Sequence, residues 1–168
     1  MDKYFNGAYV LEFTSKVLHP GVPMPAVFDM LLEFFDLLER REKGFGTLVL
    51  AYQTKLLQSM GVPPVLDRCA VCGEPAGQWF SIEDGGLICD SCRGKILAEE
   101  GENSARGALI YPVSFDIINA LKYFNVSPLK KLENIALNED TGRTLQKIIR
   151  EYAAYHLDAS NIKSESMV

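Results

Sequence analysis

Apolar side chains recur every three or four residues through most of this chain, in stretches that end at glycine or proline. That spacing places apolar groups on one side of a helix. It predicts helices over residues 3–18, 25–41, 46–60, 114–124, 129–137 and 141–157, with a short charged helical segment over 95–102. Pro20-Gly21 ends the first helix and Gly61 ends the third, because proline and glycine both disfavour continuation of a helix.

The segment 25–41 is the most strongly apolar of these helices. Its polar side chains form one narrow stripe, at spacings of four, three and four residues: Asp29, Glu33, Asp36 and Arg40. Every other position from Val27 to Leu38 is apolar. A helix that is apolar over so much of its surface is typical of the buried centre of a bundle. We therefore expect a central helix here, and a groove for a partner is the alternative.

The helix expected over 141–157 has two distinct faces. One face is apolar and carries Leu145, Ile148, Ile149, Tyr152 and His156. The opposite face carries three basic side chains at spacings of four and three residues: Arg143, Lys147 and Arg150. A basic stripe of this kind can hold phosphates or an acidic peptide, and the plainer interpretation is a solvated helix face. Lys122, Lys130 and Lys131 would extend the stripe only if the fold brought them to it.

The pattern changes between residues 67 and 94. Apolar residues there form two short runs, 78–82 and 86–88, around a turn at 83–86. Short runs joined by a glycine-containing turn predict a β-hairpin. All four cysteines of the chain lie in this segment, as two C-x2-C pairs separated by 16 residues: Cys69, Cys72, Cys89 and Cys92.

This cysteine spacing is typical of a zinc ribbon. Two thiolates separated by two residues reach one ion from a tight turn, and two such turns complete a tetrahedral shell. We therefore predict one structural Zn²⁺ bound by the four cysteines, in preference to two redox pairs or four inert thiols. No ligand position stays open for water, so the site is not expected to be catalytic. Metal binding would supply folding free energy that a segment of ~25 residues lacks.

Composition bounds the class of protein. The 168 residues include 48% hydrophobic and 23% charged side chains, as in globular proteins. The formal net charge is −5, and most of the excess acid lies in residues 67–92, which hold five acidic side chains and one basic one. The acidic total argues against a broad nucleic-acid-coating surface but not against a local basic patch. No apolar run approaches the ~20 residues that span a bilayer, and the first residues lack the features of a signal peptide, so we expect a cytoplasmic protein without a membrane partner.

Sequence motifs for catalysis are missing. The chain has no glycine-rich phosphate loop, no H-E-x-x-H and no G-x-S-x-G. Its two histidines, His19 and His156, have no evident nucleophile or base partner, and His156 falls on an apolar helix face. A metal-dependent hydrolase also conflicts with a shell of four thiolates. We therefore expect a protein that acts by binding and is not an enzyme.

Together these patterns predict a mainly α protein, a helical bundle with an inserted four-cysteine zinc-ribbon β-hairpin. The first part of the helical domain covers residues 1–66, the zinc ribbon covers 67–94, and the second part of the helical domain covers 95–168. The length suits one domain with a small satellite module.

Three stretches carry a family resemblance. The helix end 52–61 reads YQTKLLQSMG, and the link 64–73 reads PVLDRCAVCG. The ribbon ends in Gly85–Cys89, and the chain ends with Tyr155–Leu157 before Ile162–Ser164. These residues resemble the RecO family of recombination mediators and DNA-repair proteins, in its C-terminal helical part with an embedded zinc finger. The resemblance covers nearly the whole chain, and the order of helix, glycine, ribbon and helices is more specific than the cysteine spacing alone.

The resemblance implies a non-enzymatic factor for DNA repair and homologous recombination. Such a factor assists displacement of single-stranded DNA-binding protein, recombinase loading and strand annealing. Family members normally begin with an OB-fold barrel of roughly 80 residues, which is implicated in binding DNA and the partner RecR. This chain begins at the helical part, as expected of a fragment, a truncated product or a divergent short relative. The resemblance therefore does not imply that this chain binds DNA or RecR through an OB-fold.

The family's helical domain is implicated in binding the acidic, Phe-ending tail of single-stranded DNA-binding protein. That tail requires an apolar pocket rimmed by basic side chains, for which Arg143, Lys147 and Arg150 are candidates. The resemblance also favours zinc at the four cysteines and, in a bacterium, a cytoplasmic protein associated with the nucleoid. The alternative function is a zinc-stapled adaptor without DNA affinity, whose acidic module meets a basic protein partner.

Overall fold

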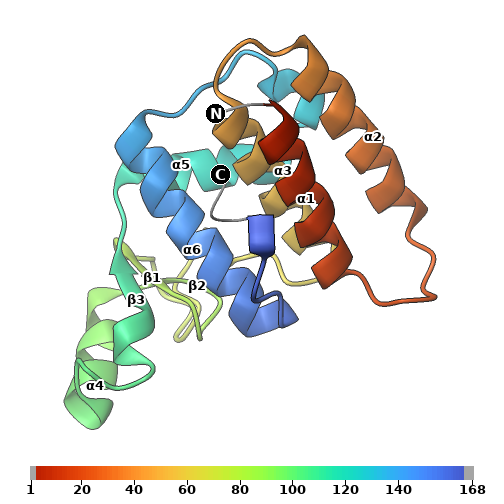
Figure 1. Cartoon of the computed structure of the whole chain (residues 1–168). Coiled ribbons are helices and arrows are strands. Elements are labelled where there is room, and N and C mark those ends of the chain that lie inside the picture. Colours follow the sequence, from red (N-terminus) through yellow and green to blue (C-terminus); the bar gives the residue numbers. More distant parts are fainter. Residues whose placement is uncertain (1–2, 165–168) are drawn as a thin grey trace.

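The structure is a computed structural model and describes residues 3–164 (Figure 1). Its helices are α1 (Lys3–Val17), α2 (Pro25–Arg40), α3 (Phe45–Ser59), α4 (Asp90–Glu100), α5 (Phe115–Val126) and α6 (Glu139–Leu157). Its strands are β1 (Trp79–Ser81), β2 (Gly86–Ile88) and β3 (Ile110–Pro112), and its 3-10 turns are η1 (Gly107–Leu109) and η2 (Leu129–Leu132). The predicted class, a mainly helical fold with an inserted four-cysteine ribbon, is confirmed. Over the described residues, no helix is both long enough and apolar enough to span a membrane.

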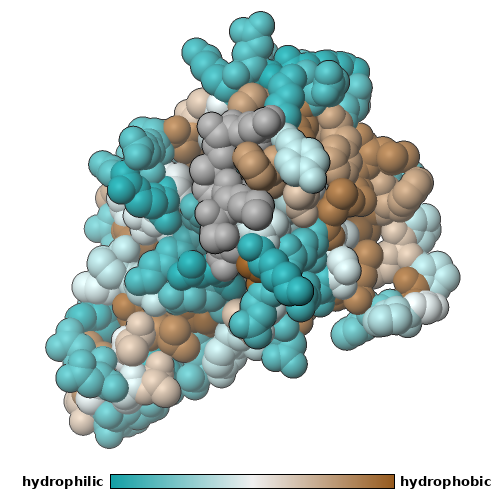
Figure 2. Space-filling view, in the orientation of Figure 1, coloured by the Kyte–Doolittle hydropathy of each residue, from teal (hydrophilic) through white to brown (hydrophobic). Residues whose placement is uncertain are grey.

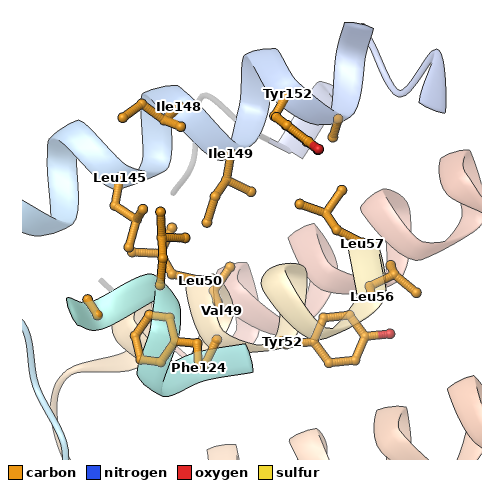
Figure 3. Close-up of a cluster of buried hydrophobic side chains, with 14 of the residues drawn as sticks. Val49, Leu50, Tyr52, Leu56, Leu57, Phe124, Leu145, Ile148, Ile149 and Tyr152 are labelled. Atoms are coloured by element: carbon orange, nitrogen blue, oxygen red, sulfur yellow. The ribbon is translucent and has the colours of Figure 1, made fainter. Parts of the chain in front are cut away.

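Helix α3 forms the centre of the bundle. It contacts α1, α2, α5 and α6, and ten of its 15 residues are buried. Figure 3 shows part of the resulting core, which gathers Val49, Leu50, Leu56 and Leu57 of α3 with Phe124 of α5 and with Leu145, Ile148, Ile149 and Tyr152 of α6. Full burial of one such aliphatic side chain contributes roughly 1.5–3 kcal/mol. Most of the bundle therefore depends on contacts with α3.

The prediction that the segment 25–41 is the buried centre is wrong. Only one narrow side of α2 is buried, formed by Val27, Phe34, Leu37 and Leu38. Phe28 is 60% exposed and Leu32 is 55% exposed. The reason is that α3 already occupies the centre, so α2 packs on the outside of the bundle against α3 and α1. Within the part of the chain that the structure describes, no neighbouring element covers the remaining apolar side of α2.

The ribbon is a three-stranded antiparallel sheet in the order β2-β1-β3. The predicted hairpin of β1 and β2 is present, with Phe80 opposite Leu87. Strand β3 pairs with the other edge of β1, where Tyr111 lies opposite Phe80. The sequence pattern did not predict β3, because three residues that end in proline show no recognisable alternation.

The link after α3 is fixed to the ribbon at Val65. Its N–H donates to the Gly85 carbonyl at 2.9 Å, and its own carbonyl accepts from the Leu87 N–H at 2.8 Å. A Cβ at Gly86 would lie 2.2 Å from the Val65 carbonyl oxygen, so this close approach requires glycine. Ile82 and Leu87 belong to the main core. The end of the ribbon near the bundle is thus part of the bundle core.

Helix α4 begins at Asp90, earlier than the segment predicted over 95–102. The Cys89 sulfur caps the helix by accepting a hydrogen bond from the Cys92 N–H at 3.4 Å. Cysteine is not among the usual N-cap residues, so no start signal was recognisable. Helix α4 crosses the boundary that was placed after residue 94, between the zinc ribbon and the second helical part. The division of the chain into 1–66, 67–94 and 95–168 stays a prediction.

The helix predicted over 129–137 is also wrong, since only the short turn η2 is helical there. The predicted start of α5 agrees with the structure, where the Ser114 hydroxyl accepts a hydrogen bond from the Ile117 N–H at 3.3 Å. Phe115, the first residue of the helix, is 69% exposed. The buried side of this helix is formed by Ile117, Ile118, Ala120, Leu121 and Phe124.

A buried arginine ties the end of α2 to the segment around η2. Arg41 is 5% exposed, and its guanidinium donates to the Leu132 carbonyl at 3.0 Å, to the Lys43 carbonyl at 3.0 Å and to the Ile135 carbonyl. Burial lowers the pKa of Arg41, against the attraction of Glu133. The planar group supplies several donors in fixed directions, which a lysine ammonium does not reproduce.

We predict that Arg41→Met lowers the free energy of unfolding by about 3 kcal/mol, because buried carbonyls that lose their donor each cost about 1–3 kcal/mol. Urea denaturation followed by circular dichroism measures the change. Arg40→Met is the matched control, because the neighbouring Arg40 side chain is 59% exposed and pairs with Asp36 on the surface. An equal effect of the two substitutions would contradict the assigned role of Arg41.

Glu12 on α1 holds the last described turn of the chain. Its carboxylate accepts the Ser164 hydroxyl at 2.7 Å, the Lys163 N–H at 2.7 Å and the Ser164 N–H at 2.9 Å. These bonds, that of the Ser164 hydroxyl first, lower the pKa of Glu12 from 4.5 to about 2. Only the ionised carboxylate accepts all three bonds, so the ionised form favours this contact.

A lowered folded-state pKa stabilises the contact at pH values above the unfolded pKa, and the stabilisation is lost as the pH falls. We therefore predict that the contact of residues 163–164 with α1 is complete above pH 4.5 and is lost as the pH falls through about 2. The amide chemical shifts of Lys163 and Ser164 in an NMR titration report this transition. Ser164→Ala should move the midpoint toward 4.5, and Glu12→Gln should abolish the transition. An unchanged midpoint in Ser164→Ala is the contrary result.

Candidate metal centre and basic groove

The fold brings the four cysteines together at the end of the ribbon far from α3. Cys69 and Cys72 lie in the turn before β1, Cys89 follows β2, and Cys92 lies in the first turn of α4. Their sulfur atoms all lie within 4.8 Å of one another, and none forms a disulfide. The Sγ atoms of Cys72 and Cys89 are 3.8 Å apart. The arrangement is a possible metal site.

Backbone N–H groups point at two of these sulfurs. The Cys89 N–H donates to Cys69 Sγ at 3.3 Å, and the Cys92 N–H donates to Cys89 Sγ at 3.4 Å. Burial opposes ionisation of Cys69, but backbone N–H donors outweigh it and lower the pKa of this thiol to about 6. Gly73 turns the chain at φ +79°, and its N–H bonds back to the Cys69 carbonyl at 2.9 Å. The first cysteine turn is thus shaped to present sulfur as an acceptor.

A small core of its own supports this end of the ribbon. Cys69, Ile88, Cys92 and Ile96 form a buried cluster separate from the main core. Trp79, the single tryptophan of the chain, packs against it. The indole N–H donates to Asp90 at 2.7 Å, and the Arg93 guanidinium lies 3.7 Å from the ring centre. So few buried apolar groups contribute little folding free energy without a further constraint.

An ion cluster around Arg106 fixes the loop that follows α4. Its guanidinium pairs with Asp84 at 2.5 Å, with Glu100 at 3.1 Å and with Glu83 at 3.7 Å. The Asp84 carboxylate is the main cause of a raised pKa for Arg106. The cluster joins the β1–β2 turn to the end of α4, and sequence spacing gave no sign of it. We assign it a structural role.

The basic residues predicted on the last helix do meet in one place. Arg143, Lys147 and Arg150 line a groove of about 890 Å³ together with Tyr111 and Pro112 of β3. All three basic side chains are exposed. Lys122, Lys130 and Lys131 do not line this groove. The basic stripe is therefore one wall of a concave surface.

Tyr111 forms part of the opposite wall. Lys147 Nζ lies 4.6 Å from the centre of the tyrosine ring, and the hydroxyl donates to the Glu151 carboxylate. Burial first, and then this carboxylate, raise the pKa of Tyr111 to about 12. The tyrosine is thus held by two residues of α6. Its place beside α6 could not be read from the sequence, because strand β3 had not been recognised.

Arg143 lines both the groove and a second cavity. This second cavity has a volume of about 930 Å³ and lies among α1, the start of α3 and the start of α6. Its apolar walls include Phe45, Val49, Leu50 and Leu137, and its charged lining residues are Lys43 and Arg143 together with Glu42 and Glu139. Arg143 also pairs with Glu139 at 3.0 Å and with Asp140 at 3.5 Å. A basic groove therefore continues into a more apolar cavity.

The two histidines lie apart from both hollows. His156 packs beside Tyr152, with ring centres 4.3 Å apart, and its Nε2 is 2.7 Å from the Ile82 carbonyl. It joins the end of α6 to the ribbon. His19 is an exposed residue of the loop after α1. His156 therefore has a structural role.

Comparison with known proteins identifies the family. The family model described as "Recombination protein O C terminal" matches residues 1–166. "DNA repair protein RecO" of Alkaliphilus metalliredigens is 25% identical over 159 residues, which are 94% of this chain and 60% of that protein. The proteins of the same name from Listeria innocua and Exiguobacterium sibiricum are each 29% identical over 147 residues, 86% of this chain, and 52% and 53% of their own length.

The chain thus spans little more than half the length of these curated relatives. The match includes both the ribbon and the helices around α3, because it extends over almost every residue of the chain. On this evidence the chain belongs to the recombination protein O (RecO) family of DNA repair proteins and corresponds to its C-terminal part.

Proposed function

We propose that this chain acts in DNA repair and homologous recombination through binding and not through bond chemistry. In this role it assists displacement of single-stranded DNA-binding protein, loading of recombinase and annealing of strands. The observation that carries the proposal is the convergence of Arg143, Lys147 and Arg150 on one groove that continues past Arg143 into a cavity with apolar walls.

The joined hollows suit the acidic, Phe-ending tail of single-stranded DNA-binding protein. A tail of this kind has carboxylates that pair with basic side chains and a terminal aromatic ring that needs apolar walls. The groove offers the basic side chains, and the cavity offers Val49 and Leu50 beside Lys43. Arg143 lies where the two parts of such a ligand would meet.

Single-stranded DNA is the second candidate ligand of the groove. Phosphate groups need several exposed cations along one path, and bases stack on aromatic rings. Arg143, Lys147 and Arg150 follow one another along α6, with Tyr111 opposite. DNA would use the groove alone, whereas the tail would also use the cavity, and this difference separates the two ligands by experiment.

The alternative function is a protein-interaction adaptor without DNA affinity. It rests on the acidic ribbon, whose residues 67–92 hold five acidic side chains and one basic one. A basic protein partner would then bind the ribbon and leave the α6 groove unused. Retained partner binding with no response to substitution of Lys147 would favour this alternative.

We also propose that the four cysteines hold one structural Zn²⁺. Zinc–sulfur bonds of about 2.3 Å in a tetrahedron place the sulfurs about 3.8 Å apart. The distance between the Cys72 and Cys89 sulfurs, 3.8 Å, fits this geometry. Four ionised thiols this close together repel one another, and a divalent cation compensates that charge. The metal would supply the constraint that the small cluster around Ile88 lacks.

We predict one zinc per chain in elemental analysis, and loss of the metal on chelation or in Cys69→Ser. The ribbon should then open at its cysteine end while the bundle stays folded. Trp79 fluorescence reports the ribbon, because the single tryptophan packs beside Cys69 and Cys92. Helical circular dichroism reports the bundle. The control is Ser91→Ala, an exposed position between two of the cysteines. Zinc-free protein with the native Trp79 signal would contradict the proposal.

We predict that the chain binds labelled oligo(dT) and an acidic Phe-ending peptide through α6. With three phosphate contacts, the logarithm of DNA affinity should fall with the logarithm of salt with a slope of about −2. Lys147→Ala should weaken binding of both ligands and reduce the size of that slope by roughly 0.7. Fluorescence anisotropy at several salt concentrations measures both effects.

The control for charge is Lys95→Ala, an exposed lysine on α4 that does not line the groove. The control for the cavity is the same peptide with its terminal Phe replaced by Ser. If the tail uses the cavity, this peptide should bind at least about tenfold more weakly, which corresponds to about 1.4 kcal/mol. Equal effects of Lys147→Ala and Lys95→Ala would refute binding at the α6 groove.

A further inference from the structure

The outer side of α1 and α2 exposes large apolar side chains that no other element of residues 3–164 covers. Tyr4 is 73% exposed, Leu11 is 49% exposed, Phe28 is 60% exposed and Leu32 is 55% exposed. We call these four residues, with the partly buried Phe35 between them, the α1–α2 apolar face. Figure 2 shows hydrophobic surface gathered on the side of the molecule where Figure 1 places these two helices.

Contacts between the helices show that these residues form one surface. Lys3 donates to the Glu39 carbonyl, so the start of α1 lies beside the end of α2. A Cβ at Gly7 would lie 3.0 Å from the Phe35 ring. The two helices are therefore antiparallel, and one further turn places Leu11 beside the turn of α2 that precedes Phe35.

The exposed residues then form two adjacent stripes at helical spacing. Tyr4 and Leu11 are seven residues apart on α1, on the side of that helix that turns toward α2. Phe28, Leu32 and Phe35 follow one another at four and three residues on α2. Gly7 has no side chain to separate the stripes, which lets Phe35 approach the α1 backbone. Two apolar ridges of this period match the surface of a third helix.

Negative charge borders the face on the side away from α1. Asp29 and Asp36, seven residues apart, lie next to Phe28 and Leu32 on the helical surface of α2. The helix as a whole carries four carboxylates and a single guanidinium, that of Arg40. Arg40 pairs with Asp36 at 2.5 Å, and both side chains are more than half exposed. Arg40 compensates the charge of Asp36, whereas the Asp29 carboxylate keeps this border negative.

We propose that the α1–α2 apolar face docks an amphipathic helix of another protein, with an apolar stripe flanked by lysine or arginine. The apolar ridges define the helical spacing of the partner, and the acidic border of α2 defines its charge. A second copy of this chain fits less well, because it would bring a second acidic α2 against the first. This surface lies on a different side of α3 from the α6 groove, so it does not depend on the function proposed for that groove.

The experiment uses two labelled helical peptides with the same leucine stripe, one flanked by lysine and one by glutamate. Fluorescence anisotropy should show binding of the lysine peptide that weakens with salt, and at least about tenfold weaker binding of the glutamate peptide. Phe28→Ser combined with Leu32→Ser should reduce lysine-peptide affinity by a further factor of about ten or more. Asp29→Lys combined with Asp36→Lys should reverse the preference between the two peptides.

The matched controls are Phe115→Ser and Val126→Ser on α5, which are apolar positions outside the face and are at least as exposed as Phe28 and Leu32. Unchanged circular dichroism shows that each variant is folded. Equal binding of both peptides, or an equal loss in the α5 variants, means unspecific apolar adhesion and overturns the proposal. Sedimentation velocity tests whether a second copy of this chain binds the face instead. A dimer of the wild-type chain that Phe28→Ser with Leu32→Ser dissociates would assign the face to a second copy and also overturn the proposal.

Discussion

Burial of α3 is the constraint on which the rest of this structure depends. Once α3 is enclosed by α1, α2, α5 and α6, each of these helices can turn only one side inward. For α6 that side carries Leu145, Ile148 and Ile149, so Arg143, Lys147 and Arg150 must face outward. For α2 the inward side is too narrow to bury Phe28 and Leu32. Both proposed interaction surfaces are therefore consequences of one packing arrangement.

The ribbon combines two different ways of gaining stability. At the end near α3, Phe80 packs on Tyr152 with ring centres 5.9 Å apart, and Ile82 and Leu87 join the main core. At the far end only the small cluster around Cys69 and Ile88 is buried. Hydrophobic burial therefore accounts for the near end, and the cysteine end is the part of the ribbon that the proposed metal ion would stabilise. The proposed ion would therefore affect the cysteine end of the ribbon and not the bundle.

Sequence periodicity predicted which segments are helices better than it predicted where each helix lies in the bundle. The two faces of α6 and the cysteine spacing were recognisable because each is a local pattern. The identity of the central helix was not, because α2 has more apolar residues than α3, and α3 keeps the polar residues Thr47, Gln53 and Thr54 in buried positions. Periodicity describes which side of a helix is apolar, but burial depends on what the other helices already cover.

The groove could be predicted only in part for a related reason. Arg143, Lys147 and Arg150 were identifiable from their spacing, whereas Tyr111 was not, because it reaches them through the pairing of β3 with β1. The start of α4 was missed because a cysteine sulfur caps it. In each case the missing information was a contact between residues distant in the sequence, or a use of a side chain that propensity does not encode.

The fold shows that the local charge of each surface matters more than the net charge of the chain. The net charge of −5 describes no single surface of the molecule, because the exposed basic residues of α6 and the exposed carboxylates of α2 lie on two different helices that both pack on α3. Exposed charges separated by more than about 10 Å are largely screened from one another at physiological salt. The basic wall of α6 and the acidic border of α2 can therefore attract ligands of opposite sign independently. A protein with this arrangement can hold an anionic ligand on one side and a basic partner on the other, which is the physical requirement for bringing two such molecules together.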